Sequence, residues 1–152
     1  MRLVIQRVER AEVRIDGTVV GSIVRGAVVL AGVAQGDTPA VIDRMADKLL
    51  GLRYFRDDSG RTNADLAAAN GELLVISQFT LLADLRRGRR PGFGHAAPPD
   101  EAEALLDRFA ERLRASGARV KTGRFGAVMA VELVNDGPFT LTLDSASDLG
   151  PG

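Results

Sequence analysis

Residues 131–143 read VELVNDGPFTLTL, and in this stretch two segments of alternating apolar and polar residues flank the abrupt break Asn135-Asp136-Gly137-Pro138. Proline fixes its own φ and donates no backbone hydrogen bond, while the glycine before it has no Cβ. We therefore expect a tight, stiff turn that exposes bare backbone where other residues would present side chains. Backbone exposed in this way can take part in recognition.

A second stretch becomes polar where a core strand would stay apolar. Residues 72–76 read ELLVI, which is typical of a buried strand, and they lead directly into Ser77-Gln78-Phe79-Thr80. We expect this strand to run to about residue 79. The hydroxyls of Ser77 and Thr80 are candidate nucleophiles, and the amide of Gln78 is a candidate contact for an oxyanion or an amide.

The composition fits one globular domain. The chain has 152 residues, of which 45% are hydrophobic and 26% are charged, enough to form a hydrophobic core. The absence of cysteine excludes disulfides and thiolate metal sites, and one histidine cannot supply a cluster of ligands, so we expect no metal and no cofactor. No apolar run approaches the roughly 20 residues of a membrane span. We expect a cytosolic protein with a single domain at residues 1–144 and a disordered polar tail at residues 145–152.

Charge is balanced overall but is concentrated in one loop. Because 20 basic residues face 20 acidic ones, the chain has no long-range attraction for polyanions, and any contact with RNA must be local. Four arginines lie close together, and the planar guanidinium suits bidentate contact with phosphate. These residues are Arg86, Arg87, Arg89 and Arg90. The alternative interpretation is a solvated loop whose arginines reflect codon preference.

The order of the expected elements indicates a mixed α/β fold. Alternation at residues 2–15 and 18–24 around the turn signal Asp16-Gly17 predicts an antiparallel hairpin, and residues 27–33 form an apolar central strand. The later elements expected are two amphipathic helices at about 38–53 and 99–116, and strands at 54–55, 72–79, 119–122, 128–134 and 139–143. This order predicts a three-layer β-β-α sandwich, with two sheets and both main helices packed on one of them. A homodimer would bury the uncovered face of the other sheet.

Ser77-Gln78-Phe79-Thr80 and the stretch NDGPFT at residues 135–140 together resemble the two signature motifs of the D-aminoacyl-tRNA deacylases. Those are dimeric proofreading enzymes that hydrolyse D-amino acids from tRNA. The resemblance also takes in VIQRV at residues 4–8, TGRFG at residues 122–126, and Arg89-Arg90-Pro91 with Phe93, so it covers nearly everything up to about Leu143. It implies a tRNA ester hydrolase that works as a two-fold homodimer, with neither a membrane nor DNA as a partner.

The resemblance implies that Gly137-Pro138 discriminates between enantiomers. In the family this Gly-Pro bond is cis and is inserted into the active site of the opposite subunit, which makes the active sites interfacial. Both carbonyl oxygens would hold the α-ammonium group of the substrate, and the rigid backbone would fill the space that an L side chain needs. Many D side chains should therefore be accepted. Glycine should not be excluded, which extends the expected substrates to glycyl-tRNA mischarged on tRNA-Ala.

The resemblance also gives roles to residues outside the Gly-Pro segment. Thr80 and the backbone around Phe79 would line the pocket, while the terminal 2′-hydroxyl of the tRNA assists the attacking water. Arg7, which stands in the matching context Gln6-Arg7-Val8, would brace the Gly-Pro segment. The remaining substrate contacts are expected at Asn135, Phe93, Phe125 and Met129, the last two near the terminal adenosine.

Packing alone is the alternative interpretation for several of these residues. Phe125 and Met129 are equally typical of a hydrophobic core, and Phe93 could simply anchor its loop. Gly92 departs from the family, which often has serine there. Its lack of a hydroxyl removes any hydrogen bond at that point and is expected to loosen the loop.

Two other classes of function stay open on the residues alone. One is a noncatalytic protein that binds the 3′ end of tRNA through the arginine cluster and the pocket. The other is a small-molecule esterase with Thr80 as nucleophile, although the sequence shows no partner that could lower the pKa of its hydroxyl. His95 is the only candidate histidine base, but no motif surrounds it in its glycine-rich loop, so a surface position is the preferred interpretation.

Overall fold

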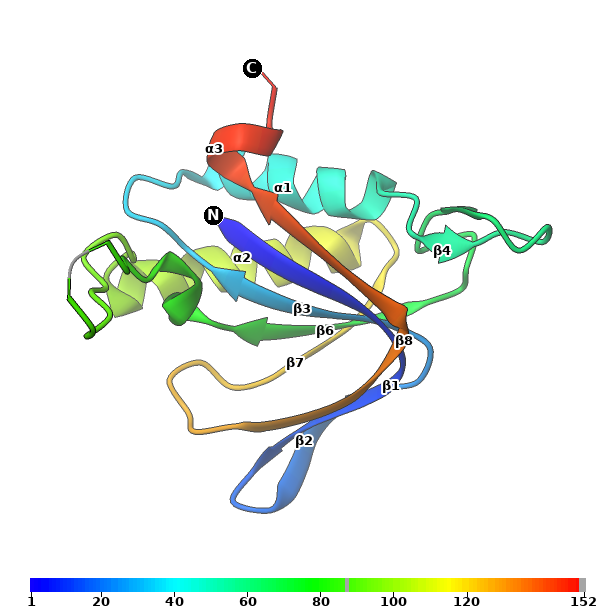
Figure 1. Cartoon of the computed structure of the whole chain (residues 1–152), viewed down its shortest axis with the longest axis horizontal. Helices are drawn as coiled ribbons and strands as arrows, with labels where there is room; N and C mark the ends of the chain where they lie inside the picture. The colour runs from blue at the N-terminus through cyan, green and yellow to red at the C-terminus, as the bar shows by residue number, and fades with distance from the viewer. Residues whose placement is uncertain (87, 151–152) are drawn as a thin grey trace.

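The computed structural model describes residues 1–86 and 88–150 (Figure 1). Six strands form one sheet in the order β2-β1-β3-β6-β7, with β8 paired to β1. The strands of this sheet are β1 (Arg2–Ile15), β2 (Thr18–Ile23), β3 (Gly26–Gly32), β6 (Glu72–Ser77), β7 (Arg119–Thr122) and β8 (Ala130–Asp144). The other elements are the helices α1 (Pro39–Gly51), α2 (Pro99–Ala115) and α3 (Ser145–Asp148), the 3-10 helix η1 (Phe79–Leu82), and a small sheet of β4 (Phe55–Arg56) and β5 (Thr62–Ala64).

Strand β1 joins the two halves of the large sheet because it is 14 residues long. Its first half pairs antiparallel with β3, and its second half pairs antiparallel with β2 along the same edge. Its other edge pairs with β8 over almost its full length, and Figure 1 shows the two strands bending together. The predicted mixed α/β class is confirmed. Apart from the short pair β4-β5, the described strands are hydrogen-bonded into one large sheet, where the sequence predicted two main sheets. The three-layer sandwich stays a prediction.

The hairpin between β1 and β2 turns at the predicted dipeptide. Asp16 has a φ of 49° and Gly17 a φ of 79°. Positive φ at both central residues is what a two-residue type I′ turn requires, and this turn matches the twist of the flanking strands. A local sequence signal therefore sets the turn of the first hairpin, and the register shifts farther along, between Val13 and Arg14.

The two long helices begin at the predicted prolines. Thr38 caps α1, its hydroxyl oxygen accepting a hydrogen bond from the backbone N–H of Val41 at 3.3 Å, and Pro39 occupies the first turn. Helix α2 begins at Pro99 and ends before Gly117, which has a φ of 92°. Both helices lie in crossovers between parallel strands, α1 between β3 and β6 and α2 between β6 and β7.

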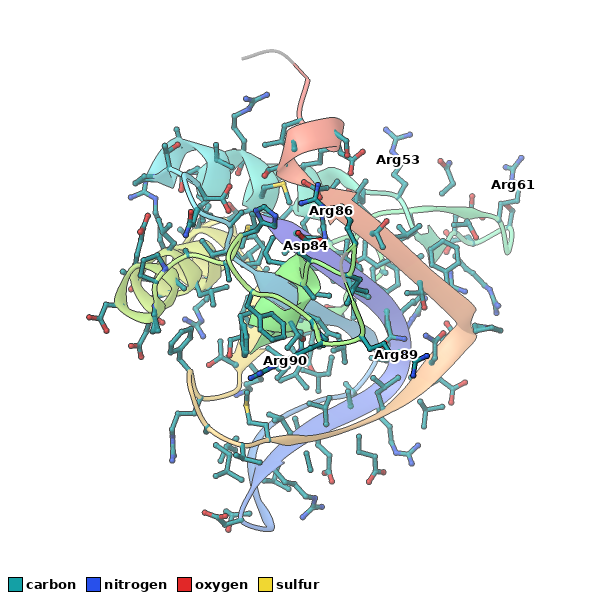
Figure 2. All side chains as sticks on the ribbon, turned by 60° about the vertical axis from the view of Figure 1, so that its left-hand side comes forward. Arg53, Arg61, Asp84, Arg86, Arg89 and Arg90 are labelled. Atoms are coloured by element: carbon teal, nitrogen blue, oxygen red, sulfur yellow. The ribbon has the colours of Figure 1, made fainter. Side chains whose placement is uncertain are left out.

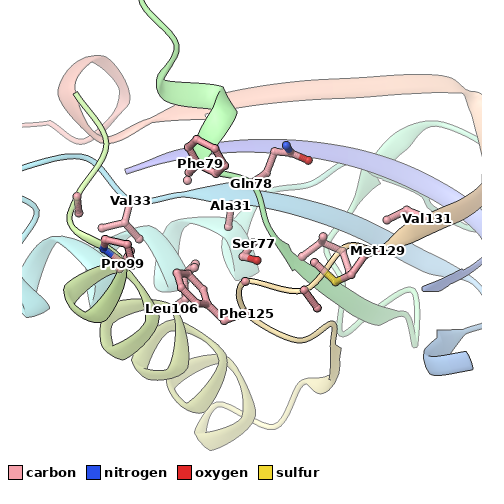
Figure 3. Close-up of a pocket in the computed structure, with 16 residues that line it drawn as sticks. Ala31, Val33, Ser77, Gln78, Phe79, Pro99, Leu106, Phe125, Met129 and Val131 are labelled. Atoms are coloured by element: carbon pink, nitrogen blue, oxygen red, sulfur yellow. The ribbon is translucent and has the colours of Figure 1, made fainter. Parts of the chain in front are cut away.

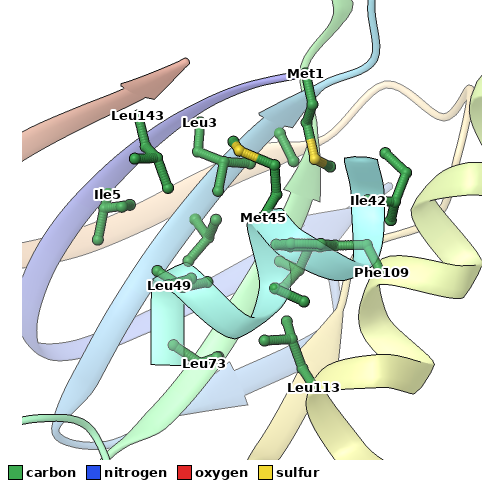
Figure 4. Close-up of a cluster of buried hydrophobic side chains, with 14 of the residues drawn as sticks. Met1, Leu3, Ile5, Ile42, Met45, Leu49, Leu73, Phe109, Leu113 and Leu143 are labelled. Carbon is green, nitrogen blue, oxygen red and sulfur yellow. The ribbon is translucent and has the colours of Figure 1, made fainter. Parts of the chain in front are cut away.

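The central strands β3 and β6 bury both faces. One face packs with α1 and α2 in the larger hydrophobic core, where Met45, Leu49 and Phe109 from the helices meet Leu73 from β6 (Figure 4). The opposite face packs against the second half of β1 and against β2. The residues of this smaller core are Val8, Ala11, Val13, Ile23, Val28, Leu74 and Ile76. This two-sided burial explains why the central strands read as continuous apolar runs.

The break at Asn135-Asp136-Gly137-Pro138 is a bulge within one strand, so the prediction of a turn between two strands is wrong. Both flanking segments belong to β8 and pair with β1 in the same direction. Gln6 faces Thr140 and Val8 faces Asn135, so five steps along β8 face two along β1, which leaves three extra residues. Such an excess pushes the extra backbone out of the ladder without reversing the chain.

Two other local predictions need correction. Strand β6 ends at Ser77 rather than at residue 79, because Phe79 begins the 3-10 helix η1. The tail predicted to be disordered contains helix α3, whose N-cap Asp144 accepts a hydrogen bond from the N–H of Ala146, while Lys48 of α1 donates to the carbonyl of Asp148 at 2.6 Å. The last part of that prediction, residues 151–152, lies outside the described residues. Across the described parts of the chain, no helix is long and apolar enough to cross a membrane.

Candidate active site

A cavity of about 560 Å³ opens at the carboxyl ends of the parallel strands β3 and β6. Figure 3 shows Ser77 and Gln78 on one side of it, with Phe125 and Met129 on the other. The remaining wall comes from the end of β3, the start of α2 and the segment before β8. Its residues are Ala31, Gly32, Val33, Ile76, Phe79, Ala97, Pro99, Ala102, Leu106, Gly126, Ala127 and Val131. The end of a parallel pair is a common position for a ligand site in an α/β fold.

The predicted motif at residues 77–80 is positioned by the last pairings of β6 with β3. Ser77 faces Ala31 in the register, and the N–H of Gln78 donates to the carbonyl of Ala31 at 2.8 Å. The chain then turns into η1, which packs so closely over β3 that a Cβ on Gly32 would lie 2.4 Å from a Leu82 side-chain atom and 2.8 Å from the carbonyl oxygen of Gln78. The polar break in the sequence therefore marks the point where the strand ends at the cavity.

Thr80 is exposed and is not among the residues that line the cavity. Its hydroxyl accepts a hydrogen bond from the side-chain amide of Gln78 at 2.5 Å. Within residues 1–86 and 88–150, no carboxylate or histidine forms a hydrogen bond with this hydroxyl. An amide cannot remove a proton at neutral pH, so Thr80 lacks the activation that a nucleophile requires.

Aromatic side chains gather at the open side of the cavity. Phe79 is 57% exposed, and its ring meets the ring of Phe93 edge to face, with centroids 4.9 Å apart. Phe125 and Met129 are half-buried on the opposite wall. Gly123 makes room for that wall, because a Cβ there would lie 2.5 Å from the sulfur of Met129. The structure thus brings together three of the predicted contacts and the 77–79 part of the motif.

The arginine cluster is divided by the structure. We define the arginine loop as residues 84–86 and 88–95. Arg86 forms a two-pronged ion pair with Asp84, at 2.9 and 2.7 Å, while Arg89 and Arg90 are exposed (Figure 2). The Arg86 guanidinium holds the pKa of the Asp84 carboxyl well below its usual range. Arg86 is therefore already engaged within its own loop, and Arg87 lies outside the described residues.

The Gly-Pro segment is exposed but internally fixed. Gly137 has a φ of 141°, the Gly137–Pro138 peptide bond is cis, and both residues are exposed. The side chain of Asn135 closes the bulge: its oxygen accepts from the N–H of Phe139 at 2.6 Å, and its amide donates to the Thr140 hydroxyl at 3.3 Å. Asn135, predicted as a substrate contact, thus has its side chain engaged in holding the bulge.

Arg7 supports the bulge from below and is 3% exposed. Its Nε lies 3.1 Å from both the carbonyl and a carboxylate oxygen of Asp136, and its Nη1 donates to the carbonyl of Tyr54 at 2.7 Å. Its guanidinium also stacks 4.5 Å from the ring centroid of Phe139. A buried charge is tolerated only with such pairing and hydrogen bonding. The contacts made by Arg7 are those expected of a residue that braces the Gly-Pro segment.

Three of these supporting groups were missed in the sequence. The Tyr54 carbonyl is a backbone group that no motif marks, and Asp136 and Asp84 stood beside more conspicuous residues. One signal was available: strand alternation places residue 7 on the same inward face as Leu3 and Ile5, which are 0% and 1% exposed. An arginine at an inward position needs buried partners.

The cavity and the bulge do not meet within one chain. None of residues 135–139 lines the cavity. Arg7, under the bulge, pairs with Ala27 near the start of β3, whereas the cavity lies beyond Ala31 at its end. Four residues of strand span roughly 13 Å. The two motifs that are most distinctive in the sequence therefore lie near opposite ends of β3.

Comparison with known proteins gives consistent relatives over nearly the whole chain. A family model described as D-Tyr-tRNA(Tyr) deacylase matches residues 4–144. A protein named D-aminoacyl-tRNA deacylase from Symbiobacterium thermophilum is 54% identical over 145 residues, 95% of this chain and 96% of the relative. One with the same name from Roseiflexus castenholzii is 55% identical over 146 residues, 96% of this chain and 93% of the relative. A solved structure named c-Myc DNA Unwinding Element Binding Protein matches with a TM-score of 0.90 at 39% identity, over 95% of this chain and 98% of that one.

Proposed function

We propose, since this chain belongs to the D-Tyr-tRNA(Tyr) deacylase family, that it hydrolyses the ester bond of D-aminoacyl-tRNA to give a free amino acid and tRNA. The observation that carries this proposal is the cavity at the ends of β3 and β6, where Ser77, Gln78 and Phe79 face Phe125 and Met129. Its volume of about 560 Å³ falls within the ~300–1,000 Å³ typical of ligand pockets. A tRNA substrate makes the cytoplasm the expected place of action.

The chemistry required of this cavity is modest. An aminoacyl-tRNA ester is already activated, so hydrolysis needs a positioned water and stabilisation of the oxyanion. The motif contributes a hydroxyl from Ser77 and an amide from Gln78, and neither group is a base at neutral pH. We therefore assign these groups to holding the ester, while the neighbouring 2′-hydroxyl of the terminal ribose assists the water.

The remaining substrate contacts follow from the walls of the cavity. Phe125 and Met129 offer an apolar surface on which the terminal adenine can pack. Arg89 and Arg90 are exposed on the arginine loop beside Phe93, where they can contact phosphates of the tRNA end. Arg86 is excluded from that role, because its guanidinium is paired with Asp84.

Rejection of L-amino acids is assigned to the bulge of a second copy of the chain. The exposed Gly137-Pro138 backbone is braced by Arg7 but lies away from the cavity of its own chain. A two-fold homodimer would let each bulge enter the cavity of its partner and would complete a three-layer arrangement by covering the free sheet face. Main chain then fills the space that an L side chain needs, whereas D side chains point outward and glycine is not excluded.

The test is hydrolysis of matched substrates by the purified protein. The set is D-tyrosyl- and L-tyrosyl-tRNA(Tyr), glycyl-tRNA(Ala), and a free D-tyrosine ester. We expect rapid hydrolysis of the D-tyrosyl and glycyl forms, and little hydrolysis of the L form or the free ester. Binding without turnover would instead identify a noncatalytic tRNA-end binder. Efficient cleavage of the free ester through an acyl-enzyme would identify an esterase with Thr80 as nucleophile.

A further inference from the structure

The arginine loop returns to the cavity at Phe93, and few of its own side chains hold it there. It contains Gly88, Gly92 and Gly94, and each glycine raises the entropy that is lost when a loop is ordered. Gly92 has no side chain where a relative with serine could form a hydrogen bond. A Cβ at Gly92 would lie 3.9 Å from Asp84, so the glycine is not required by close packing. The order of this loop must come from contacts elsewhere.

Asp84 supplies those contacts from both its backbone and its side chain. The N–H of Asp84 donates to the carbonyl of Gly92 at 2.7 Å, and the N–H of Gly92 donates back at 3.0 Å. One carboxylate oxygen accepts from the backbone N–H of Arg86 at 3.0 Å and from its Nε at 2.9 Å, and the other accepts from its Nη2 at 2.7 Å. His95 Nε2 lies 3.7 Å from the same carboxylate. The backbone of Asp84 therefore pairs with Gly92, while its carboxylate binds Arg86 and lies near His95.

Backbone hydrogen bonds hold the chain on both sides of Phe93. On one side Gly92 is paired with Asp84. On the other side the carbonyl of Phe93 accepts from the N–H of Ala96 at 3.1 Å, and Ala97 then joins the cavity wall by donating to the carbonyl of Val33 at 3.0 Å. The Phe93 ring is thereby presented to Phe79, the exposed aromatic residue of the cavity.

We infer that Asp84 is a positioning residue of the active site, which keeps the arginine loop closed so that Phe93 is held against Phe79 where the substrate enters. The role rests on the proposed function, because it concerns the binding of aminoacyl-tRNA. Arg86 serves as the ion-pair partner of Asp84 in this role and is not a ligand for phosphate. This assignment also explains why a cluster of four arginines contains one carboxylate at its base.

The closing experiment compares Asp84→Asn, Arg86→Gln and the double variant with a matched control. The control is Asp43→Asn, which removes a similar exposed fork, between Asp43 of α1 and Arg108 of α2 at 2.8 and 2.6 Å, on residues that do not line the cavity. Exposed pairs contribute little to stability, so all four variants should fold. Two readouts are used: steady-state kinetics with D-tyrosyl-tRNA, and hydrogen exchange of the substrate-free protein over residues 84–97.

We expect Asp84→Asn and Arg86→Gln each to raise KM roughly threefold with a smaller change in kcat, which is within the contribution of an exposed ion pair. The double variant should be no worse than either single one, because both break the same pair. Hydrogen exchange over residues 84–97 should rise in the Asp84 and Arg86 variants. Asp43→Asn should change neither KM nor this exchange.

Several outcomes would overturn the inference. If Arg86 binds phosphate, Asp84→Asn frees it and KM stays constant or falls, while Arg86→Gln alone weakens the salt dependence of KM. Faster exchange with unchanged KM would leave Asp84 a merely structural residue. Unchanged exchange would show that the loop does not depend on this pair. The exchange measurement needs no activity, so a wild-type protein that fails to deacylate D-tyrosyl-tRNA would refute the proposed function and still leave the closure of the loop tested.

Discussion

The cavity at residues 77–79 and the bulge at residues 135–139 are built in opposite ways. The cavity is an opening lined largely by apolar side chains, with Ser77 and Gln78 as the polar groups of its motif. The bulge is exposed main chain supported from beneath by Arg7, which is 3% exposed and makes an ion pair, a hydrogen bond to Tyr54 and a stacking contact. The cavity provides room for a ligand, and the bulge provides a rigid surface of main chain.

Under the proposed function, this difference divides the work between the two regions. An activated ester asks little of the groups around it, so a cavity without a strong base suffices. Stereochemical selection asks for rigidity, because a wall that gives way by an ångström no longer excludes a side chain. The buried charge of Arg7 accordingly supports the bulge and not the cavity. Changes confined to one region test this division, with the other region as the reference.

The largest effect is expected from Arg7→Ala. It leaves Asp136 without its buried partner and should lower the free energy of unfolding by about 3 kcal/mol. Urea denaturation followed by circular dichroism measures this. The control is Arg10→Ala on the same strand, where the pair with Glu132 spans 3.7 Å between side chains that are 62% and 66% exposed, and it should change stability by less than about 0.5 kcal/mol. Equal effects would contradict the bracing role of Arg7.

Next in size is Gly137→Ala. Gly137 has a φ of 141°, and a Cβ there would lie 2.9 Å from the N–H nitrogen of Phe139. The backbone must shift, and kcat/KM for D-tyrosyl-tRNA should fall roughly 100-fold. Gly60→Ala is the control, because Gly60 has a φ of 79° but nothing within 4 Å of a Cβ; it should be strained yet fully active. A fully active Gly137→Ala enzyme would remove the bulge from the account.

A smaller loss is expected from Thr80→Ala in the cavity motif. The only described hydrogen-bond partner of the Thr80 hydroxyl is the Gln78 amide, so kcat should fall less than roughly tenfold. Single-turnover kinetics and mass spectrometry for an acyl-enzyme provide the measurement. A loss in kcat of roughly 1,000-fold, or a covalent intermediate on Thr80, would show that the cavity works by nucleophilic catalysis. The cavity would then not be the site without a strong catalytic group that is contrasted with the bulge.

The smallest effect concerns pH at the cavity entrance. The hydrogen bonds from Arg86 lower the pKa of the Asp84 carboxyl from its ordinary 3.8. When folding lowers the pKa of a carboxyl, the ionised group stabilises the folded state at pH values above its pKa in the unfolded chain. That stabilisation is lost only as the pH falls through the pKa of the folded state, so the closed loop should persist on acidification to pH 4. A carbon NMR titration of Asp84 should show a midpoint below 3.8, which returns toward that value in Arg86→Gln. A midpoint at or above 3.8 in the wild type would contradict the ion pair.

Much of the fold was predictable because its signals are local. The Asp16-Gly17 turn, the proline starts of both long helices and the apolar central strands each depend on neighbours in the sequence. The break at residues 135–138 was found but misread as a turn. A bulge and a turn share the same local composition, and only the pairing of both flanks with β1 distinguishes them.

The candidate site was predictable where its side chains lie together in one segment of the sequence. The polar residues that end β6 identified the cavity, and the resemblance identified Arg7. The carbonyl of Tyr54 could not be found, because a backbone group carries no mark in the sequence. The pairing of Asp84 with Arg86 was hidden among four arginines. Helix α3 was missed because its stability comes from contacts with α1, 100 residues away at Lys48 and Asp148.

The central claim is that the bulge of one copy serves the cavity of another, and subunit mixing tests it most directly. Gly137→Ala spoils only the bulge, and Ala127→Trp fills only the cavity, so each homodimer should be inactive on D-tyrosyl-tRNA. After unfolding and refolding of an equal mixture, half of the dimers carry one intact bulge facing one intact cavity, and about a quarter of the wild-type activity per site should return. A mixture no more active than its two parents would contradict the claim.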